Sequence, residues 1–185
     1  ERLLSCKKYF NRSIPVAILP IRMLPDPVLS SKAKRVKTFD VTLRRLVDDM
    51  VDTMRAAKGV GLAGNQIGVL LRVAVIEIPE ENGRIRVFIN PEFVSRSGQR
   101  EMEEGCLSYP GYRGSTTRSE RVHVRAQDLS GKLFSVKAEG TLLAHALEHE
   151  IDHLSGTLYL ERLISKDAIW KIPEHEMAGY DPEHT

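Results

Sequence analysis

The chain has 185 residues, of which 42% are apolar and 28% charged, a balance typical of a globular domain with a buried core. Its 27 basic and 25 acidic residues leave a formal net charge of +2, too even to predict nucleic-acid binding from charge alone. No apolar run approaches the roughly 18 to 20 residues needed to span a bilayer, so no membrane segment is predicted. The two cysteines, Cys6 and Cys106, are no disulfide framework, and a reducing compartment is the simpler interpretation.

The expected domain organisation is one folded domain over residues 15–168, with an N-terminal tail over 1–14 and a C-terminal tail over 169–185. The first segment is rich in basic residues, and its apolar stretches are too short for a secretory signal. We interpret it as a disordered tail outside the fold, with the remnant of an organelle transit peptide as the alternative.

Near the start of the domain, Pro25 and Pro27 predict a loop over 25–36, because proline interrupts regular structure. Further along, apolar residues recur at helical spacing while Lys, Arg and Asp fill the other positions. This pattern predicts an amphipathic helix over 41–57. Gly59 is expected to end the helix, since glycine readily adopts the left-handed conformation found at helix ends.

The middle of the chain contains four runs rich in β-branched residues. Residues 71–78 and 85–94 are predicted to form a hairpin with Asn82-Gly83 at its turn, because this dipeptide favours a tight β-turn. Residues 121–128 and 132–140 are predicted to form a second hairpin of the same kind.

A final helix is expected to follow Thr141, a typical N-cap residue, and to end near Gly156. Strands gathered in the middle of the chain, with a helix on each side, indicate an α+β fold. We therefore predict antiparallel or mixed β-sheets packed around this last helix, with the amphipathic helix nearer the N-terminus.

The last helix contains the stretch EHEIDHLSG (148–156). His149 and His153 are four residues apart, so they lie on one face of a helix, about one turn from each other. Two such imidazoles are suited to bind one metal ion, and Glu150 between them is placed to take a proton from a neighbouring water. The pattern therefore predicts a metal-binding helix at the centre of the fold.

Two ligands do not complete a tetrahedral site, and the residues alone leave the third ligand open. His145 shares the same stripe, but it lies eight residues from His153, about 12 Å along a helix and too far to bind the same ion. It is interpreted either as a pocket residue or as a partly buried histidine. The longer metalloprotease signature has a histidine where this chain has Tyr159, so that interpretation fails.

The remaining candidates for the third ligand are three downstream carboxylates and one cysteine: Glu161, Glu174, Glu176 and Cys106. A carboxylate would give the two-histidine, one-glutamate site of a zinc metallopeptidase. A thiolate binds first-row divalent ions well, although a lone cysteine is more often a small buried apolar residue. A fourth side chain in place of water would indicate a structural metal site instead. Spacing does not decide among these alternatives.

Three segments taken together resemble the signature motifs of the peptide deformylases: GVGLAGNQ (59–66), EGCLS (104–108) and HEIDH (149–153). The resemblance extends from about Ile18 to Leu163. It implies a catalytic domain that hydrolyses the N-formyl group from the N-terminal formyl-methionine of nascent polypeptides and releases formate.

The same resemblance implies one divalent metal ion per chain, bound by Cys106, His149 and His153 with water in the fourth position. Fe²⁺ is the implied native metal, and Zn²⁺, Ni²⁺ or Co²⁺ is implied to be able to occupy the site. Glu150 is the implied general base and acid.

Contacts with the substrate are also implied by the resemblance. The side-chain amide of Gln66 and the backbone N–H of Leu62 would form an oxyanion hole for the formyl oxygen. Six residues are expected to bind the peptide or its methionine side chain: Gly59, Val60, Gly61, Arg113, Leu142 and His145. The glycines at 59 and 61 would let an extended peptide approach the loop closely.

Three further residues are candidates for supporting the metal ligands, without a single assigned role. Glu104, Asp152 and Arg118 are candidates for orienting the histidines or bracing the cysteine loop, with a salt bridge between helix and sheet as the alternative. Two residues depart from the family pattern. Gly64, where the family often has Ala, is expected to loosen the active-site loop, and Glu148, where it often has Gln, has no assigned role.

Nascent formylated substrates imply contact with the ribosome near the exit tunnel, with no membrane partner and no specific nucleic-acid sequence. The expected compartment is the cytoplasm, with an organelle matrix or stroma as the alternative.

Overall fold

The structure is a computed structural model that describes residues 17–79 and 83–173. These residues form two α-helices, eight β-strands and three short 3₁₀ helices. In chain order the helices and strands are α1 (Val41–Ala56), β1 (Gly61–Ala63), β2 (Val73–Glu77), β3 (Ile85–Ser97), β4 (Arg100–Cys106), β5 (Tyr109–Arg118), β6 (Arg121–Gln127), β7 (Leu133–Glu139), α2 (Leu142–Leu154) and β8 (Ile169–Lys171). The 3₁₀ helices are Pro27–Ser30, Gly64–Ile67 and Tyr159–Arg162.

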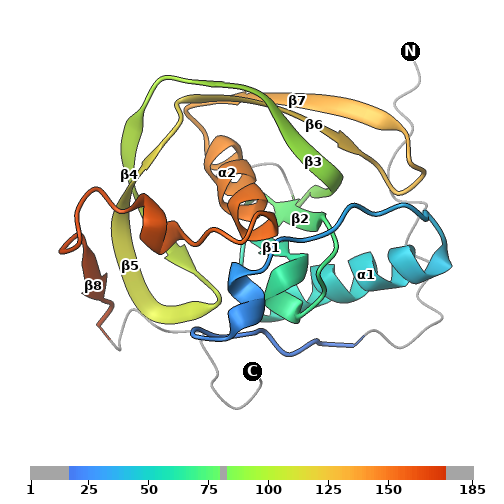
Figure 1. Cartoon of the computed structure of the whole chain (residues 1–185), viewed down its shortest axis with the longest axis horizontal. Helices are drawn as coiled ribbons and strands as arrows, with labels where there is room; N and C mark the ends of the chain where they lie inside the picture. The colour runs from blue at the N-terminus through green and yellow to red at the C-terminus, as the bar shows by residue number, and fades with distance from the viewer. Residues whose placement is uncertain (1–16, 80–82, 174–185) are drawn as a thin grey trace.

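The strands form two sheets. The larger has the order β1-β2-β3-β6-β7 and the smaller the order β4-β5-β8, and every pair of neighbouring strands is antiparallel. Figure 1 shows α2 in the centre of the molecule, with β3, β6 and β7 passing over it, β4 and β5 beside it, and α1 on the other side of β1 and β2. The predicted α+β class, with antiparallel sheets and two helices, is confirmed.

Two apolar clusters hold these layers together, one for each helix. Alternate residues of β2 divide between them: Val73 and Val75 pack with α1, whereas Ile76 packs with α2. This division follows from the alternation of side chains along a strand. The face of α2 opposite its histidines is therefore buried in the larger sheet, which fixes the orientation of the helix.

Helix α1 begins as predicted, with the Asp40 side chain accepting a hydrogen bond of 3.0 Å from the backbone N–H of Leu43. Its end differs from the prediction. Lys58 adopts the left-handed conformation, with φ 54°, and Gly59 follows it with its N–H bonded to the Met54 carbonyl. Gly59 therefore does not provide the left-handed residue that ends the helix. It instead allows close packing against Leu107, because a Cβ there would lie 2.7 Å from the Leu107 side chain.

The other predicted elements are largely confirmed. The two hairpins are β2–β3 and β6–β7. Helix α2 starts where predicted, with Thr141 accepting from the Ala144 N–H at 3.3 Å, and Gly156 follows its end with φ 77°. In the first hairpin turn, Asn82 lies outside the described residues, and Gly83 has φ 69°.

Strands β4 and β5 were not predicted from the sequence. Their buried side chains are mostly polar, including Glu104, Thr116 and Arg118. A buried polar face carries no apolar alternation, so the periodicity that marks a half-buried strand is missing. These polar residues form the network that supports the site.

The C-terminal part of the fold extends beyond the boundary expected at residue 168. Residues 169–171 form β8, which pairs with β5 from Tyr112 to Gly114. The segments 1–16 and 174–185 lie outside the described residues and contain the rest of the two expected tails. Within the described ranges, no helix is both long and apolar enough to cross a membrane.

Candidate active site

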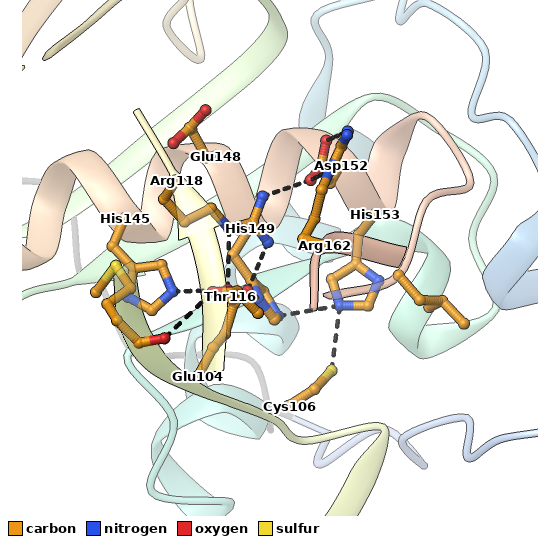
Figure 2. A network of polar contacts seen from close by, with 12 residues as sticks. Glu104, Cys106, Thr116, Arg118, His145, Glu148, His149, Asp152, His153 and Arg162 are labelled. Carbon is orange, nitrogen blue, oxygen red and sulfur yellow. Dashed lines mark hydrogen bonds and ion pairs between the residues drawn. The ribbon is translucent and has the colours of Figure 1, made fainter. Parts of the chain in front are cut away.

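Cys106, His149 and His153 converge beside α2, as Figure 2 shows. The Cys106 Sγ lies 3.2 Å from His153 Nε2, which lies 3.2 Å from His149 Nε2. One donor atom from each residue lies within 4.8 Å of the other two, a spacing at which one ion can bind all three. Burial opposes ionisation of the thiol, but His153 and His149 outweigh it and hold the Cys106 pKa well below its usual value.

The three side chains meet because two elements are fixed against each other. Cys106 is the last residue of β4, and His149 and His153 occupy successive turns of α2. His153 is buried, whereas Cys106 and His149 are partly buried and line a cavity. The group is therefore open on one side.

Glu104 orients His149. Its Oε1 lies 2.5 Å from His149 Nδ1, which leaves His149 Nε2 facing Cys106. Arg118 donates two hydrogen bonds to the same carboxylate, at 2.9 and 2.6 Å, and Thr116 donates a third at 2.7 Å. Burial opposes ionisation of Glu104, but its hydrogen-bond donors hold its pKa well below the usual range. It is therefore a carboxylate that accepts the His149 proton.

Arg118 also links this carboxylate to α2. It donates to Asp152 at 2.5 Å, and Arg162 donates to Asp152 at 3.0 and 2.9 Å. The Arg118 side chain is 3% exposed, so these contacts lie in the protein interior. The network orients a histidine and also fastens the helix to the smaller sheet, which are the two functions that the sequence left as alternatives.

Glu150 is buried, and its Oε2 has no hydrogen-bond partner among the described residues. Its other oxygen packs against Gly61, where a Cβ would lie 2.2 Å away. Burial raises the pKa of Glu150 to about 7, although His149 and His153 oppose this effect. Gly61 therefore leaves space for the Glu150 carboxyl group, in addition to the substrate approach expected from the sequence.

Gln66 points its side-chain amide nitrogen toward Cys106. Its Oε1 accepts a hydrogen bond of 2.9 Å from the Ala63 N–H, so the nitrogen must face the other way. That nitrogen lies 3.6 Å from Cys106 Sγ and 3.2 Å from Ser108 Oγ. Leu62 is fully buried on β1, in register with Val75.

A cavity of about 480 Å³ opens beside these side chains. It is lined by Gln66, Cys106, His149 and Glu150 and by all six residues expected to bind substrate: Gly59, Val60, Gly61, Arg113, Leu142 and His145. His145 is partly buried, and its Nε2 lies 3.3 Å from Glu104, so it lines the cavity and touches the supporting network. Arg113 is exposed and forms an ion pair with Glu103.

Glu148 has a structural role that the sequence did not indicate. Its carboxylate is buried and accepts hydrogen bonds from the Ser119 N–H at 2.7 Å and the Ser119 hydroxyl at 2.9 Å. Arg96 lies 3.6 Å away. Glu148 thus fastens α2 to the β5–β6 turn.

The expectation that Gly64 loosens the loop is wrong. Gly64 is buried, and a Cβ there would lie 2.7 Å from the carbonyl oxygens of both Val69 and Leu71. The loop packs tightly because this residue is glycine.

Other candidate ligands lie elsewhere. Glu161 is exposed, and its carboxylate accepts the Leu158 N–H at 2.9 Å. Glu174 and Glu176 lie outside the described residues. Thr116, Ser108 and Arg162 belong to the site's hydrogen-bond network but carried no signal in the sequence, because each is a single polar residue without a spacing pattern.

The fold and the site together define a class of protein: an α+β domain with a cysteine, two histidines and a buried glutamate beside a cavity, a donor set suited to a metal ion. The polypeptide deformylase family model matches residues 18–168. The chain belongs to the peptide deformylase family. Enzymes of this family are metal-dependent hydrolases that remove the formyl group from the N-terminal formyl-methionine of nascent polypeptides, and this chain is an enzyme of that kind.

Relatives cover most of the chain. A peptide deformylase from Dehalococcoides mccartyi is 46% identical over 163 residues, which are 88% of this chain and 96% of that protein. One from Chromobacterium violaceum is 49% identical over 148 residues, 80% of this chain and 88% of that protein. The crystal structure of a peptide deformylase from Legionella pneumophila is 50% identical, covers 80% of this chain and 86% of that chain, and gives a TM-score of 0.76.

Proposed function

We propose that formyl hydrolysis takes place at Cys106, His149 and His153, with Glu150 as general base and acid. The observation that carries this proposal is the convergence of the three donor atoms within 4.8 Å at the wall of a cavity that Glu150 also lines. The donor set fits a first-row divalent ion, because thiolate and imidazole both bind such ions and His149 already has its other nitrogen engaged.

Fe²⁺ is the native metal in this proposal, and Zn²⁺, Ni²⁺ and Co²⁺ are substitutes. The family resemblance supports the choice of iron. The mixed sulfur and nitrogen donors support binding of the other three ions in its place. Metal analysis of protein purified without oxygen tests it: iron at about one ion per chain is expected. Zinc as the only metal in active, anaerobically prepared protein would contradict it.

When bound, the ion supplies Lewis acidity that polarises the formyl carbonyl and makes a nearby water more acidic. Glu150 accepts the proton of that water as the water attacks the formyl carbon, and it then delivers a proton to the leaving amine. A pKa of about 7 suits both steps, because the carboxyl exchanges protons readily near neutral pH. The products are formate and a free amino terminus.

Gln66 is the proposed donor to the oxygen that gains charge during the attack. Its Oε1 is held by the Ala63 N–H, so the amide nitrogen is oriented before substrate binds. The Leu62 N–H is the second donor by family resemblance. Gly59, Val60 and Gly61 would bind the peptide backbone, Leu142 and His145 the methionine side chain, and Arg113 the peptide near the entrance.

The test compares formate release from formyl-Met-Ala-Ser with acetate release from acetyl-Met-Ala-Ser, without oxygen and with metal analysis of the same sample. We expect turnover of the formyl peptide only. Cys106→Ser is expected to lose metal and activity, and Glu150→Gln to keep metal and lose activity. Glu148→Gln is the matched control: it makes the same change at a nearby buried carboxylate that binds Ser119 instead of lining the cavity, and it should stay active. No formate from metal-replete protein would overturn the proposal.

Contact with the ribosome near the exit tunnel is proposed from the nature of the substrate alone. Co-sedimentation with translating ribosomes tests it, and recovery of all the enzyme in the supernatant at low salt would contradict it. The proposed compartment is the cytoplasm, with an organelle matrix or stroma as the alternative; fractionation of the source cells distinguishes them.

A further inference from the structure

A second cavity, of about 430 Å³, lies on the larger sheet. It is formed by β3, β6 and β7, the strands that pass over α2 in Figure 1. On β6 the side chains of Val122 and Val124 pack with α2, so Arg121 and His123, which alternate with them, face the other side of the sheet. None of the described residues that line this cavity also lines the active-site cavity. The two cavities are therefore separate.

Strand β3 is bulged beside this cavity. Its register against β6 shifts between Phe93 and Ser95. Such a bulge bends its strand, and bulges often lie next to functional sites. Beyond the bulge, Ser95 is in register with His123 and Ser97 with Arg121, and all four residues line the cavity. Two hydroxyls therefore lie beside a histidine and an arginine on the neighbouring strand.

Strand β7 adds one cation and one anion. Lys137 is in register with His123, and Glu139 is in register with Arg121. Arg121 donates hydrogen bonds of 3.2 Å to Glu139 and of 3.2 Å to Ser97, and its guanidinium has further N–H donors. The side chains of Arg121 and Glu139 are 57% and 62% exposed, so their ion pair is weak and screened by solvent. Two cations thus outnumber one carboxylate in this cavity.

Two nitrogen atoms of the cavity residues have no partner among the described residues. His123 Nε2 is buried and forms no hydrogen bond there. The Lys137 side chain is exposed and forms no ion pair within the same ranges. A buried polar atom without a partner is costly, and a bound oxygen atom would remove that cost at His123.

These groups match the chemistry of a phosphate group. A phosphate carries up to two negative charges and offers three strong acceptor oxygens. Ammonium and guanidinium groups form charge-assisted hydrogen bonds to such oxygens, and the serine hydroxyls and the imidazole are additional donors. The cavity volume lies within the roughly 300–1,000 Å³ of small-molecule sites, which leaves room for the molecule that carries the phosphate.

We propose that the cavity formed by Ser95, Ser97, Arg121, His123 and Lys137 binds a phosphate group of a larger molecule, either a free nucleotide or an RNA strand. Recognition depends on the phosphate and its charge, so no base sequence is specified. The inference does not rest on the proposed function, because the two cavities share no described residue.

The test titrates the metal-loaded enzyme with adenosine, adenosine monophosphate and a short single-stranded RNA, by calorimetry at one fixed, low salt concentration. Adenosine monophosphate is expected to bind and adenosine is not. Lys137→Ala should weaken binding of the nucleotide about tenfold, because one charge-assisted hydrogen bond is lost. Glu139→Gln should strengthen it roughly threefold, because a like charge is removed. Lys132→Ala is the matched control, since it removes the same charge from the exposed turn of the same hairpin outside the cavity, and it should change nothing.

The same titrations distinguish the two sources of phosphate. RNA that binds more tightly than the nucleotide, and still depends on Lys137, would identify a strand as the ligand, whereas equal or weaker binding of RNA would identify the free nucleotide. Formate release should be unchanged in all three variants, because none of these residues lines the active-site cavity. Adenosine monophosphate that binds no more tightly than adenosine would overturn the proposal. Binding that is unaffected by Lys137→Ala, as expected for a phosphate bound at the metal ion, would also overturn it.

Discussion

Glu104 and His149 are joined by a hydrogen bond of 2.5 Å that crosses from β4 to α2 in the protein interior. The Glu104 side chain is fully buried and also accepts hydrogen bonds from Arg118 and Thr116, with His145 Nε2 3.3 Å away. One carboxylate therefore sets the ring orientation of a proposed ligand and balances a buried arginine. We therefore expect metal binding and folding to depend on the same residue.

Glu104→Gln is expected to weaken metal binding about 10- to 100-fold, because the amide is a poorer acceptor for the His149 proton. Stability should fall as well, by less than the roughly 3–5 kcal/mol typical of a broken buried pair, since Arg118 keeps Asp152 as a partner. Chelator competition and urea unfolding measure the two effects. Glu101→Gln, on the exposed part of β4, is the control. Unchanged metal affinity in Glu104→Gln would contradict the role.

Gly61→Ala is expected to lower turnover about 100- to 10,000-fold, the range of a lost general base or acid, because the new Cβ would occupy the position of the Glu150 carboxylate. Metal content should stay near one ion per chain, since neither Cys106 nor the histidines move. Formate release and metal analysis on one sample check both. A variant with near wild-type turnover would show that Glu150 functions from another position.

The helices of this fold could be predicted because their apolar residues follow the helical period. The same period placed His149 and His153 on one face of α2 with Glu150 between them, so two of the proposed ligands and the proposed base followed from the sequence. Cys106 did not follow from spacing. It lies where β5 bulges out of the ladder, and only the resemblance of three separated motifs indicated it.

The supporting network could be predicted only in part: Glu104, Arg118 and Asp152 were candidates, but their burial and the contributions of Thr116 and Arg162 were not indicated, because buried polar residues leave the same sequence pattern as a solvated face. Glu104, Thr116 and Arg118 alternate with other polar residues along β4 and β5, and nothing local distinguishes buried from exposed positions. The close approaches at Gly61 and Gly64 were missed for a similar reason. They depend on atoms from Glu150, Val69 and Leu71, which only the folded chain brings near.

The pair of Arg55 and Glu77 predicts a pH dependence of stability. The hydrogen bond from Arg55 lowers the pKa of Glu77 below its ordinary 4.5 in the folded state. A lowered folded-state pKa stabilises the fold above the unfolded-state pKa, and this stabilisation is lost as the pH falls through the folded-state value. Glu77→Gln should therefore cost about 0.5 kcal/mol at pH 7, a small value because Arg55 is 41% exposed, and progressively less as the pH falls below 4.5 and through the lowered folded-state pKa. Urea unfolding across this range checks it, and a cost independent of pH would contradict it.

Glu148 allows the structural and chemical roles of α2 to be separated. Glu148→Ala removes the acceptor for both Ser119 donors and should lower the free energy of unfolding by about 1–3 kcal/mol, because a buried N–H is left unpaired. Glu148→Gln keeps one acceptor oxygen and should cost less. Turnover per folded molecule and metal content should not change in either, since the side chain points away from the donor group (Figure 2) and accepts its hydrogen bonds from Ser119. Loss of metal from a fully folded Glu148→Gln protein would mean that the charge beside His149, and not the link to the β5–β6 turn, is what this residue contributes.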